Sequence, residues 1–172
     1  MAHLNYDVLN TGYDELYGEE QRVKYRRAFE QAPKNFSRIV DVGCGTGLLR
    51  EFLREQHVDA EYVGVDVSSG MLNKAREKID SSTHLVQADA HRLPFRDQVF
   101  SHVFSFTVVH HLEPKRFLEE ALRICSGVVV VSQHKRLNPR ITGIPVADDE
   151  TVDEIFVQPV SSVFRKASGI GC

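Results

Sequence analysis

The residues with the clearest chemical meaning lie between positions 39 and 49, where an apolar run ends in an acid and alternate glycines follow. The acid is Asp41, and the glycines are Gly43, Gly45 and Gly47. A β-branched run that stops in a glycine turn and restarts as a helix brings bare backbone and a helix N-terminus up to a ligand. Asp66 ends the next β-branched run, close to the offset of about 20 residues at which a carboxylate reaches ribose hydroxyls. This pattern predicts a nucleoside-binding α/β domain.

The spacing of the glycines separates two kinds of nucleoside. A dinucleotide-binding turn has the pattern Gly-x-Gly-x-x-Gly, because the third glycine lets the helix pack closely on the strand beneath a pyrophosphate. Counted from Gly43 or from Gly45, that third position falls on Leu48 or Arg50. Asp41 would also repel a pyrophosphate, whereas it suits a ligand with an amino group. A nicotinamide-dependent oxidoreductase is therefore the less favoured alternative, and a glycine turn without any ligand is a further one.

More candidate residues fall where the expected strands end. Asp89 and Ala90 follow the third strand, and residues 106–111 follow the fourth. Open α/β sheets bind ligands outside the carboxyl ends of their strands, where the strand order reverses. We therefore expect these residues to gather around one site with Asp41 and Asp66. The simpler alternatives are that Asp66 caps the next helix and that Asp89 only shapes a turn.

Together these stretches resemble the motifs of the class I S-adenosylmethionine-dependent methyltransferases, in a short form, over about residues 38 to 135. The glycine pattern resembles the first motif, and residues 64–72, 87–95 and 104–112 resemble the second, third and fourth. The similarity is greatest to a broad subgroup with ubiquinone- and menaquinone-pathway enzymes, many small-molecule methyltransferases and some that modify tRNA. Two features depart from the family. Ser101 stands where an aspartate is usual, and no Asn-Pro-Pro-Tyr element follows the fourth strand, which disfavours the amide- and base-methylating subclass.

The resemblance implies a set of cofactor-binding positions at the strand ends and in the loops that follow them: Asp41, Gly43, Gly45, Gly47, Asp66, Val67, Met71, Asp89, Ala90, Ser105 and Phe106. In this scheme the first acid and the glycine backbone hold the methionine end of S-adenosylmethionine, and the backbone after the fourth strand faces its amino group. Asp66 accepts from both ribose hydroxyls, with Val67 and Met71 against the adenine. Asp89 meets the exocyclic amine of the adenine, and the backbone of Ala90 meets a ring nitrogen.

The implied reaction is an in-line displacement at the sulfonium methyl group. The acceptor is not identified, and a small molecule is favoured over a macromolecule. Orientation of the reactants alone can supply roughly 7–11 kcal/mol. A general base is optional, and His110 and His111 are the weak candidates for it because they follow the fourth strand. Their alternative role is to pack the start of the next helix. No histidine or cysteine pair has zinc-ligand spacing, so we predict no metal site.

Composition and helix-forming residues predict a single domain over residues 1–172, of which 42% are hydrophobic. Residues 1–34 form a helical segment that could cover the cofactor as a lid, with Tyr13 and Tyr17 excluding water. The alternative is a helix that packs on the flank of the sheet. Residues 38–135 form the cofactor-binding core, and residues 136–172 form the edge of the sheet.

Alternating strand and helix patterns predict an α/β fold with a doubly wound, mostly parallel sheet. We expect helices over residues 13–31 and 48–57, after Ser68 and from Pro114, and strands that end at Asp41 and Asp66 or cover residues 84–88, 99–109 and 127–132. Residues 154–158 and 161–165 are expected to form an antiparallel hairpin at the edge.

The net charge of −3 favours neither a polyanion-coating nor a membrane-surface protein. No apolar run approaches the ~18 residues of a membrane span, and the first residues do not read as a signal peptide, so a cytoplasmic location is expected. Cys44 and Cys125 are predicted to be small buried side chains in a reducing compartment.

Partners other than the acceptor are less clearly indicated. The basic residues within 134–140 could contact RNA phosphates, although a solvated loop is favoured. A partner subunit or a homodimer is compatible with the sequence. The alternative functions are accordingly an RNA- or protein-modifying methyltransferase that needs a partner subunit, and an inactive cofactor-binding subunit.

Overall fold

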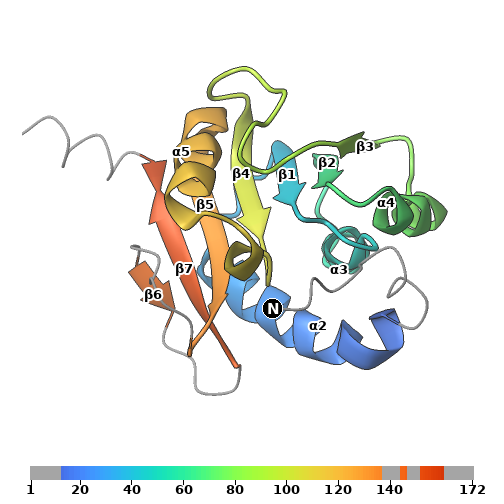
Figure 1. Ribbon diagram of the computed structural model, residues 1–172. Helices are drawn as coiled ribbons and strands as arrows, with labels where there is room; N and C mark the ends of the chain where they lie inside the picture. Colours follow the sequence, from blue (N-terminus) through green and yellow to red (C-terminus); the bar gives the residue numbers. More distant parts are fainter. Residues whose placement is uncertain (1–12, 137–143, 147–151, 161–172) are drawn as a thin grey trace, which may run out of the picture.

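The computed structural model describes residues 13–136, 144–146 and 152–160 (Figure 1). The elements in chain order are α2 (Tyr13–Gln31), β1 (Arg38–Val42), α3 (Leu48–Glu55), β2 (Glu61–Asp66), α4 (Ser69–Ala75), η1 (Arg76–Lys78), β3 (Thr83–Gln87), β4 (Phe100–Ser105), η2 (Val109–His111), α5 (Pro114–Ile124), β5 (Cys125–His134), β6 (Ile144–Val146) and β7 (Asp153–Pro159). The predicted alternation of strands and helices is present.

The strands of these ranges form one sheet in the order β3-β2-β1-β4-β5-β7-β6. Neighbours from β3 to β5 pair in parallel, whereas β7 runs antiparallel to both β5 and β6. The predicted fold class, a doubly wound and mostly parallel sheet with an antiparallel edge, is confirmed. The strand order reverses between β1 and β4, which places a crevice at the carboxyl ends of these two strands.

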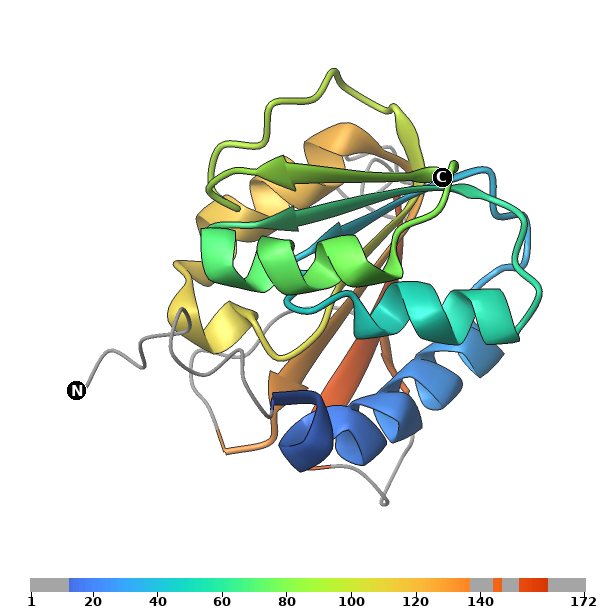
Figure 2. The same ribbon diagram turned by 90° about the vertical axis from the view of Figure 1, so that its right-hand side faces the viewer.

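Both faces of the sheet are covered by helices (Figure 2). Successive side chains of a strand point to opposite faces, and on β1 the buried Ile39 packs with residues of α2 and α3, while Val40 and Val42 pack with residues of α5. The apolar face of α3 is buried and consists of Leu48, Leu49, Phe52 and Leu53. In the described part of the chain, no helix combines the length and the apolarity needed to cross a membrane.

The antiparallel edge differs in part from its prediction. The strand expected at residues 154–158 is β7, but it pairs with β6, a segment for which no strand is predicted. Residues 161–165, the expected partner, lie outside the described residues. β6 is short and includes Pro145, which lacks an N–H donor and is tolerated on an edge strand. Three residues are too few to show a strand pattern in the sequence. β6 is recognisable as a strand only through its pairing with β7.

The strand expected at residues 99–109 is also shorter in the structure, since β4 ends at Ser105. Two residues later Thr107 has a left-handed backbone with a φ of 61°. Its N–H group donates to Oγ of Ser132 at the end of β5, at 2.8 Å. The chain therefore leaves the sheet here and continues into η2.

Candidate functional site

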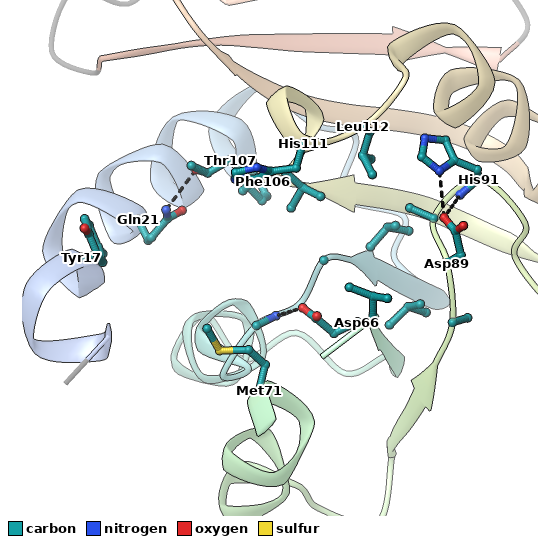
Figure 3. Close-up of a pocket in the computed structure, with 18 of the residues that line it drawn as sticks. Tyr17, Gln21, Asp66, Met71, Asp89, His91, Phe106, Thr107, His111 and Leu112 are labelled. Carbon is teal, nitrogen blue, oxygen red and sulfur yellow. Dashed lines mark hydrogen bonds and ion pairs between the residues drawn. The ribbon is translucent and has the colours of Figure 1, made fainter. Parts of the chain in front are cut away.

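A cavity of about 510 Å³ lies at the carboxyl ends of β1, β2 and β4, with further walls from α2 and from the loop after β3 (Figure 3). This volume lies within the range of small-molecule sites. The residues predicted from the sequence that line the cavity are Tyr17, Gly43, Gly45, Asp66, Val67, Met71, Asp89, Ala90, Phe106 and His111. Three others, Asp41, Gly47 and Ser105, are not among its lining residues. The side chains of Tyr13 and His110 lie outside the described structure.

The glycines of the loop after β1 serve different purposes. Gly43 and Gly45 have φ values of 78° and 54°, a backbone conformation that side chains disfavour. A Cβ atom on Gly43 would lie 2.2 Å from Cγ2 of Val108, so this glycine permits the chain after β4 to pack against the loop. A Cβ atom on Gly45 would meet nothing within 4 Å. Gly45 therefore presents bare backbone to open space in the pocket.

Asp66 ties the glycine loop to the start of α4. Its Oδ2 accepts the N–H of Gly45 at 2.9 Å, and its Oδ1 accepts the N–H of Ser68, also at 2.9 Å. Ser68 caps α4 by accepting the N–H of Met71. Each carboxylate oxygen can accept a second hydrogen bond. The cap of α4 is therefore Ser68 and not Asp66, the alternative considered for that acid, while Asp66 fixes the turn before the helix and lies on the pocket wall.

Asp89 lies at the opposite end of the pocket, where His91 orients it. Oδ1 of Asp89 accepts both the backbone N–H and the ring Nδ1–H of His91, each at 2.8 Å. The other ring nitrogen, Nε2, accepts the N–H of Glu113 at the start of α5, which assigns the ring proton to Nδ1. These bonds lower the pKa of Asp89, although burial alone would raise it. No motif predicts a role for His91, and only its place just after a strand-end acid could have indicated one.

The far wall of the pocket contains a polar network that was not predicted. Lys24 is fully buried, and its Nζ lies 2.6 Å from Oε1 of Glu20 and 3.1 Å from Oδ2 of Asp153 on β7. Nζ of Lys24 also donates to Oγ1 of Thr107 at 3.1 Å. The same oxygen accepts a hydrogen bond from Nε2 of Gln21 at 3.0 Å. Gln21 and Lys24 share a face of α2, but their partners come from distant segments. No local pattern in the sequence could have indicated this network.

Asp41 and Ser105 support the site from within the sheet. The Asp41 side chain is 3% exposed and accepts the hydroxyl of Tyr62 at 2.6 Å. Burial raises the pKa of Asp41 to about 7, the nearby Asp66 adds to this, and the bond from Tyr62 opposes it. The hydroxyl of Ser105 donates to the backbone oxygen of Val42 at 2.8 Å, which joins β4 to β1.

The helix α2 combines the two roles considered for it. Its residues Tyr25 and Ala28 are buried in the core with residues of α3, and Arg22 forms a paired salt bridge with Glu55. One turn or more earlier, Tyr17 lines the pocket while 45% exposed. α2 is therefore a flanking helix whose first half forms a wall of the pocket. Of the candidate bases, His111 lines the pocket with an exposed side chain.

Comparison with known proteins identifies the family to which the chain belongs. A family model described as "Methyltransferase domain" matches residues 40–130, the part of the chain that carries the glycine loop, Asp66 and Asp89. The chain belongs to this family. The predicted resemblance to class I S-adenosylmethionine-dependent methyltransferases is thereby confirmed.

Within the described ranges, no three His, Cys, Asp or Glu side chains are arranged to hold a metal ion.

Individual relatives differ in what they act on. A phosphatidylethanolamine N-methyltransferase of Cereibacter sphaeroides is 32% identical over 130 residues, which are 71% of this chain and 63% of that protein. A demethylmenaquinone methyltransferase of Thermus thermophilus is 35% identical over 126 residues, 69% of this chain and 55% of that protein. The chain thus spans less than two thirds of the length of these methyltransferase relatives.

Solved structures share the fold. One similar chain comes from the complex of the Haloferax volcanii Trm112 methyltransferase activator with a methyltransferase. It has a TM-score of 0.68 and 23% identity, with 78% of this chain and 62% of that chain covered.

Proposed function

We propose that the protein binds S-adenosylmethionine in this pocket and transfers its methyl group to an acceptor, preferably a small molecule. The observation that carries the proposal is the pairing of Gly45 and Asp66. A bare backbone amide and a carboxylate are bonded to each other, and both line the same open cavity. Membership of the methyltransferase family supports the same ligand.

The charges and hydrogen-bonding groups of the pocket residues support this cofactor. In the proposed arrangement, Asp66 accepts from the ribose hydroxyls, and Val67 and Met71 contact the adenine. Asp89 meets the adenine amine through Oδ2, the oxygen that His91 does not engage. Glu20, Asp66 and Asp89 line the cavity, whereas no lysine or arginine of the described residues does so. This negative wall suits a ligand whose sulfonium and ammonium groups outnumber its single carboxylate.

When bound, S-adenosylmethionine supplies an electrophilic methyl group on a positively charged sulfur. The contribution of the protein is then mainly to orient the two reactants and exclude water, and orientation is worth roughly 7–11 kcal/mol. The glycine loop and the two acids fix one reactant. The wall formed by α2 and η2 is left to hold the acceptor. His111 would serve as a base only for an acceptor that must lose a proton first.

Calorimetry with S-adenosylhomocysteine, the demethylated cofactor, tests this function. We expect the wild type to bind it, and Asp66→Ala to weaken binding by at least about tenfold, because charge-assisted hydrogen bonds contribute about 1.5–3 kcal/mol. Asp59→Ala is the matched control, since Asp59 is exposed and does not line the cavity. Unchanged affinity in Asp66→Ala, or equal binding of NAD by the wild type, would contradict the proposal.

The acceptor class can be narrowed with a cell extract. Transfer of a tritiated methyl group should persist after RNase treatment and disappear after dialysis if the acceptor is a small molecule. The reverse result would favour a macromolecular acceptor. Activity that appears only when extract protein is restored would favour the alternative with a partner subunit.

A further inference from the structure

The end of the pocket opposite Asp89 contains an unsatisfied hydrogen-bond acceptor. Gln21 is 4% exposed and lines the cavity, and its Oε1 has no hydrogen-bond partner anywhere in the described part of the chain. Leaving a buried polar atom without a hydrogen-bond partner destabilises the protein. In Figure 3 the amide nitrogen of Gln21 is bonded to Thr107, and its oxygen is turned toward the pocket. The arrangement is therefore complete only when a donor enters the pocket.

The network behind Gln21 sets which atom of the amide faces the pocket. The hydroxyl of Thr107 donates to the carboxylate of Asp153 at 3.3 Å, so it cannot donate to Gln21 as well. Thr107 can then only accept, which requires Gln21 to offer its nitrogen there. The oxygen is consequently held on the other side, toward the cavity.

Among the described residues, no cation on this wall is free to bind an anionic group. The nearest is Lys24, whose ammonium group has three donors. They are matched by three acceptors, on Glu20, Asp153 and Thr107. Glu20 itself lines the cavity next to Gln21. A carboxylate or phosphate at this end would thus face a carboxylate and an amide oxygen without a counter-charge, whereas an N–H donor would find two acceptors.

Gln21 and Glu20 also lie outside the residues that carry the cofactor motifs. The family model begins at residue 40, beyond the end of α2. The proposed cofactor contacts at Gly45, Asp66 and Asp89 all fall within it. α2 therefore adds a wall of hydrogen-bond acceptors to this core. That wall is available to the second ligand, the methyl acceptor.

We propose that the methyl acceptor is an amine, which binds as an ammonium ion with an N–H hydrogen bond to Oε1 of Gln21 and with its charge balanced by Glu20. One N–H proton then passes to the carboxylate of Glu20, and the freed lone pair of the nitrogen accepts the methyl group as the bond from that group to the sulfonium sulfur breaks. This substrate class rests on the proposed function, because it places the amine in the same pocket as the cofactor. It excludes acceptors that present a carboxylate or a phosphate to this wall.

Three probes of equal length test the proposal: propylamine, propanol and propionate. Their binding is followed by saturation-transfer NMR on protein saturated with S-adenosylhomocysteine. We expect propylamine to bind about tenfold more tightly than propanol, and propionate not to bind. Gln21→Met keeps the side-chain volume and should weaken propylamine binding about tenfold, and Glu20→Gln should weaken it several-fold. Glu19→Gln makes the same charge change on the same helix outside the cavity and should leave propylamine binding unchanged.

The outcomes separate the inference from the function beneath it. Failure of the wild type to bind S-adenosylhomocysteine would remove the function and the inference together. With that binding intact, equal responses to the three probes, including no response, would overturn the amine assignment alone. A loss of S-adenosylhomocysteine affinity in Gln21→Met would also overturn it, because Gln21 would then contact the cofactor.

Discussion

The carboxyl group of Asp41 is buried beside the hydroxyl of Tyr62, and burial raises its pKa to about 7. Its pKa in an unfolded chain is about 3.9. Between these two values the folded protein holds a proton that the unfolded chain has released. The free energy of unfolding therefore falls as the pH rises from about 4 to about 7, and it does not fall further through this group above that range.

Asp41→Asn isolates this effect, because the amide still accepts from Tyr62 and cannot ionise. We expect the free energy of unfolding of the wild type, relative to the variant, to decrease by up to about 4 kcal/mol between pH 4 and pH 8. Urea unfolding at several pH values measures the difference. Parallel pH profiles of the two proteins would show that Asp41 is ionised throughout.

His91 is a positioning residue for Asp89 rather than a group expected to touch the acceptor. Because it fixes Oδ1 of Asp89, His91→Ala should allow the carboxylate to rotate away from the adenine amine. S-inosylhomocysteine, in which an oxygen replaces that amine, distinguishes this role from a general loss of structure. We expect His91→Ala to reduce the preference for S-adenosylhomocysteine over the inosyl analogue about fivefold. His84→Ala, at an exposed histidine outside the pocket, should keep the preference.

Among the elements, the glycine loop separates effects on folding from effects on binding. Gly43→Ala should destabilise the protein by about 2–4 kcal/mol, because its methyl group would collide with Val108 and its φ is positive. Gly45→Ala has room, so we expect a loss of only about 1 kcal/mol in stability but at least tenfold in S-adenosylhomocysteine affinity. Gly18→Ala lies within α2 with open space around it and should stabilise by about 0.5–1 kcal/mol. Thermal unfolding and calorimetry would test the three variants.

Binding of S-adenosylhomocysteine by Gly45→Ala with the affinity of the wild type would contradict the role assigned to Gly45. The added methyl group would then project away from the ligand, and the open space at Gly45 would not be part of the cofactor site.

Elements with a regular hydrophobic pattern were predictable, and those defined by distant contacts were not. The apolar face of α3 and the acids at the ends of β1 and β2 follow from periodicity and from the position of the glycines. The early end of β4 does not, because the turn at Thr107 depends on a bond to Ser132. β6 depends in the same way on β7.

At the scale of the whole molecule, the ion pair of Lys24 and Asp153 joins the first described helix to β7. Both side chains are almost completely buried, so removing one partner leaves the other charge without compensation. We expect Lys24→Met to lower the free energy of unfolding by about 3–5 kcal/mol. Adding Asp153→Leu should restore part of this loss, which denaturant unfolding of the single and double variants would reveal. A double variant less stable than the sum of the single changes would contradict this account.

The same long-range contact explains which part of the site could be predicted. Gly45, Asp66 and Asp89 were found because parallel strands bring their carboxyl ends to one edge, whatever the rest of the chain does. Gln21 and Lys24 were missed because the sequence shows them only as polar residues of a helix. Their role emerges when Thr107 and Asp153 converge on them in the folded protein.

During synthesis on the ribosome, α2 leaves the exit tunnel long before Asp153 exists. Until β7 has been made, the ammonium group of Lys24 has no buried carboxylate to meet, and docking of α2 would bury it at a cost. We therefore expect α2 to be the last of the described helices to dock in the nascent chain. Cofactor capture should begin only after translation has passed β7.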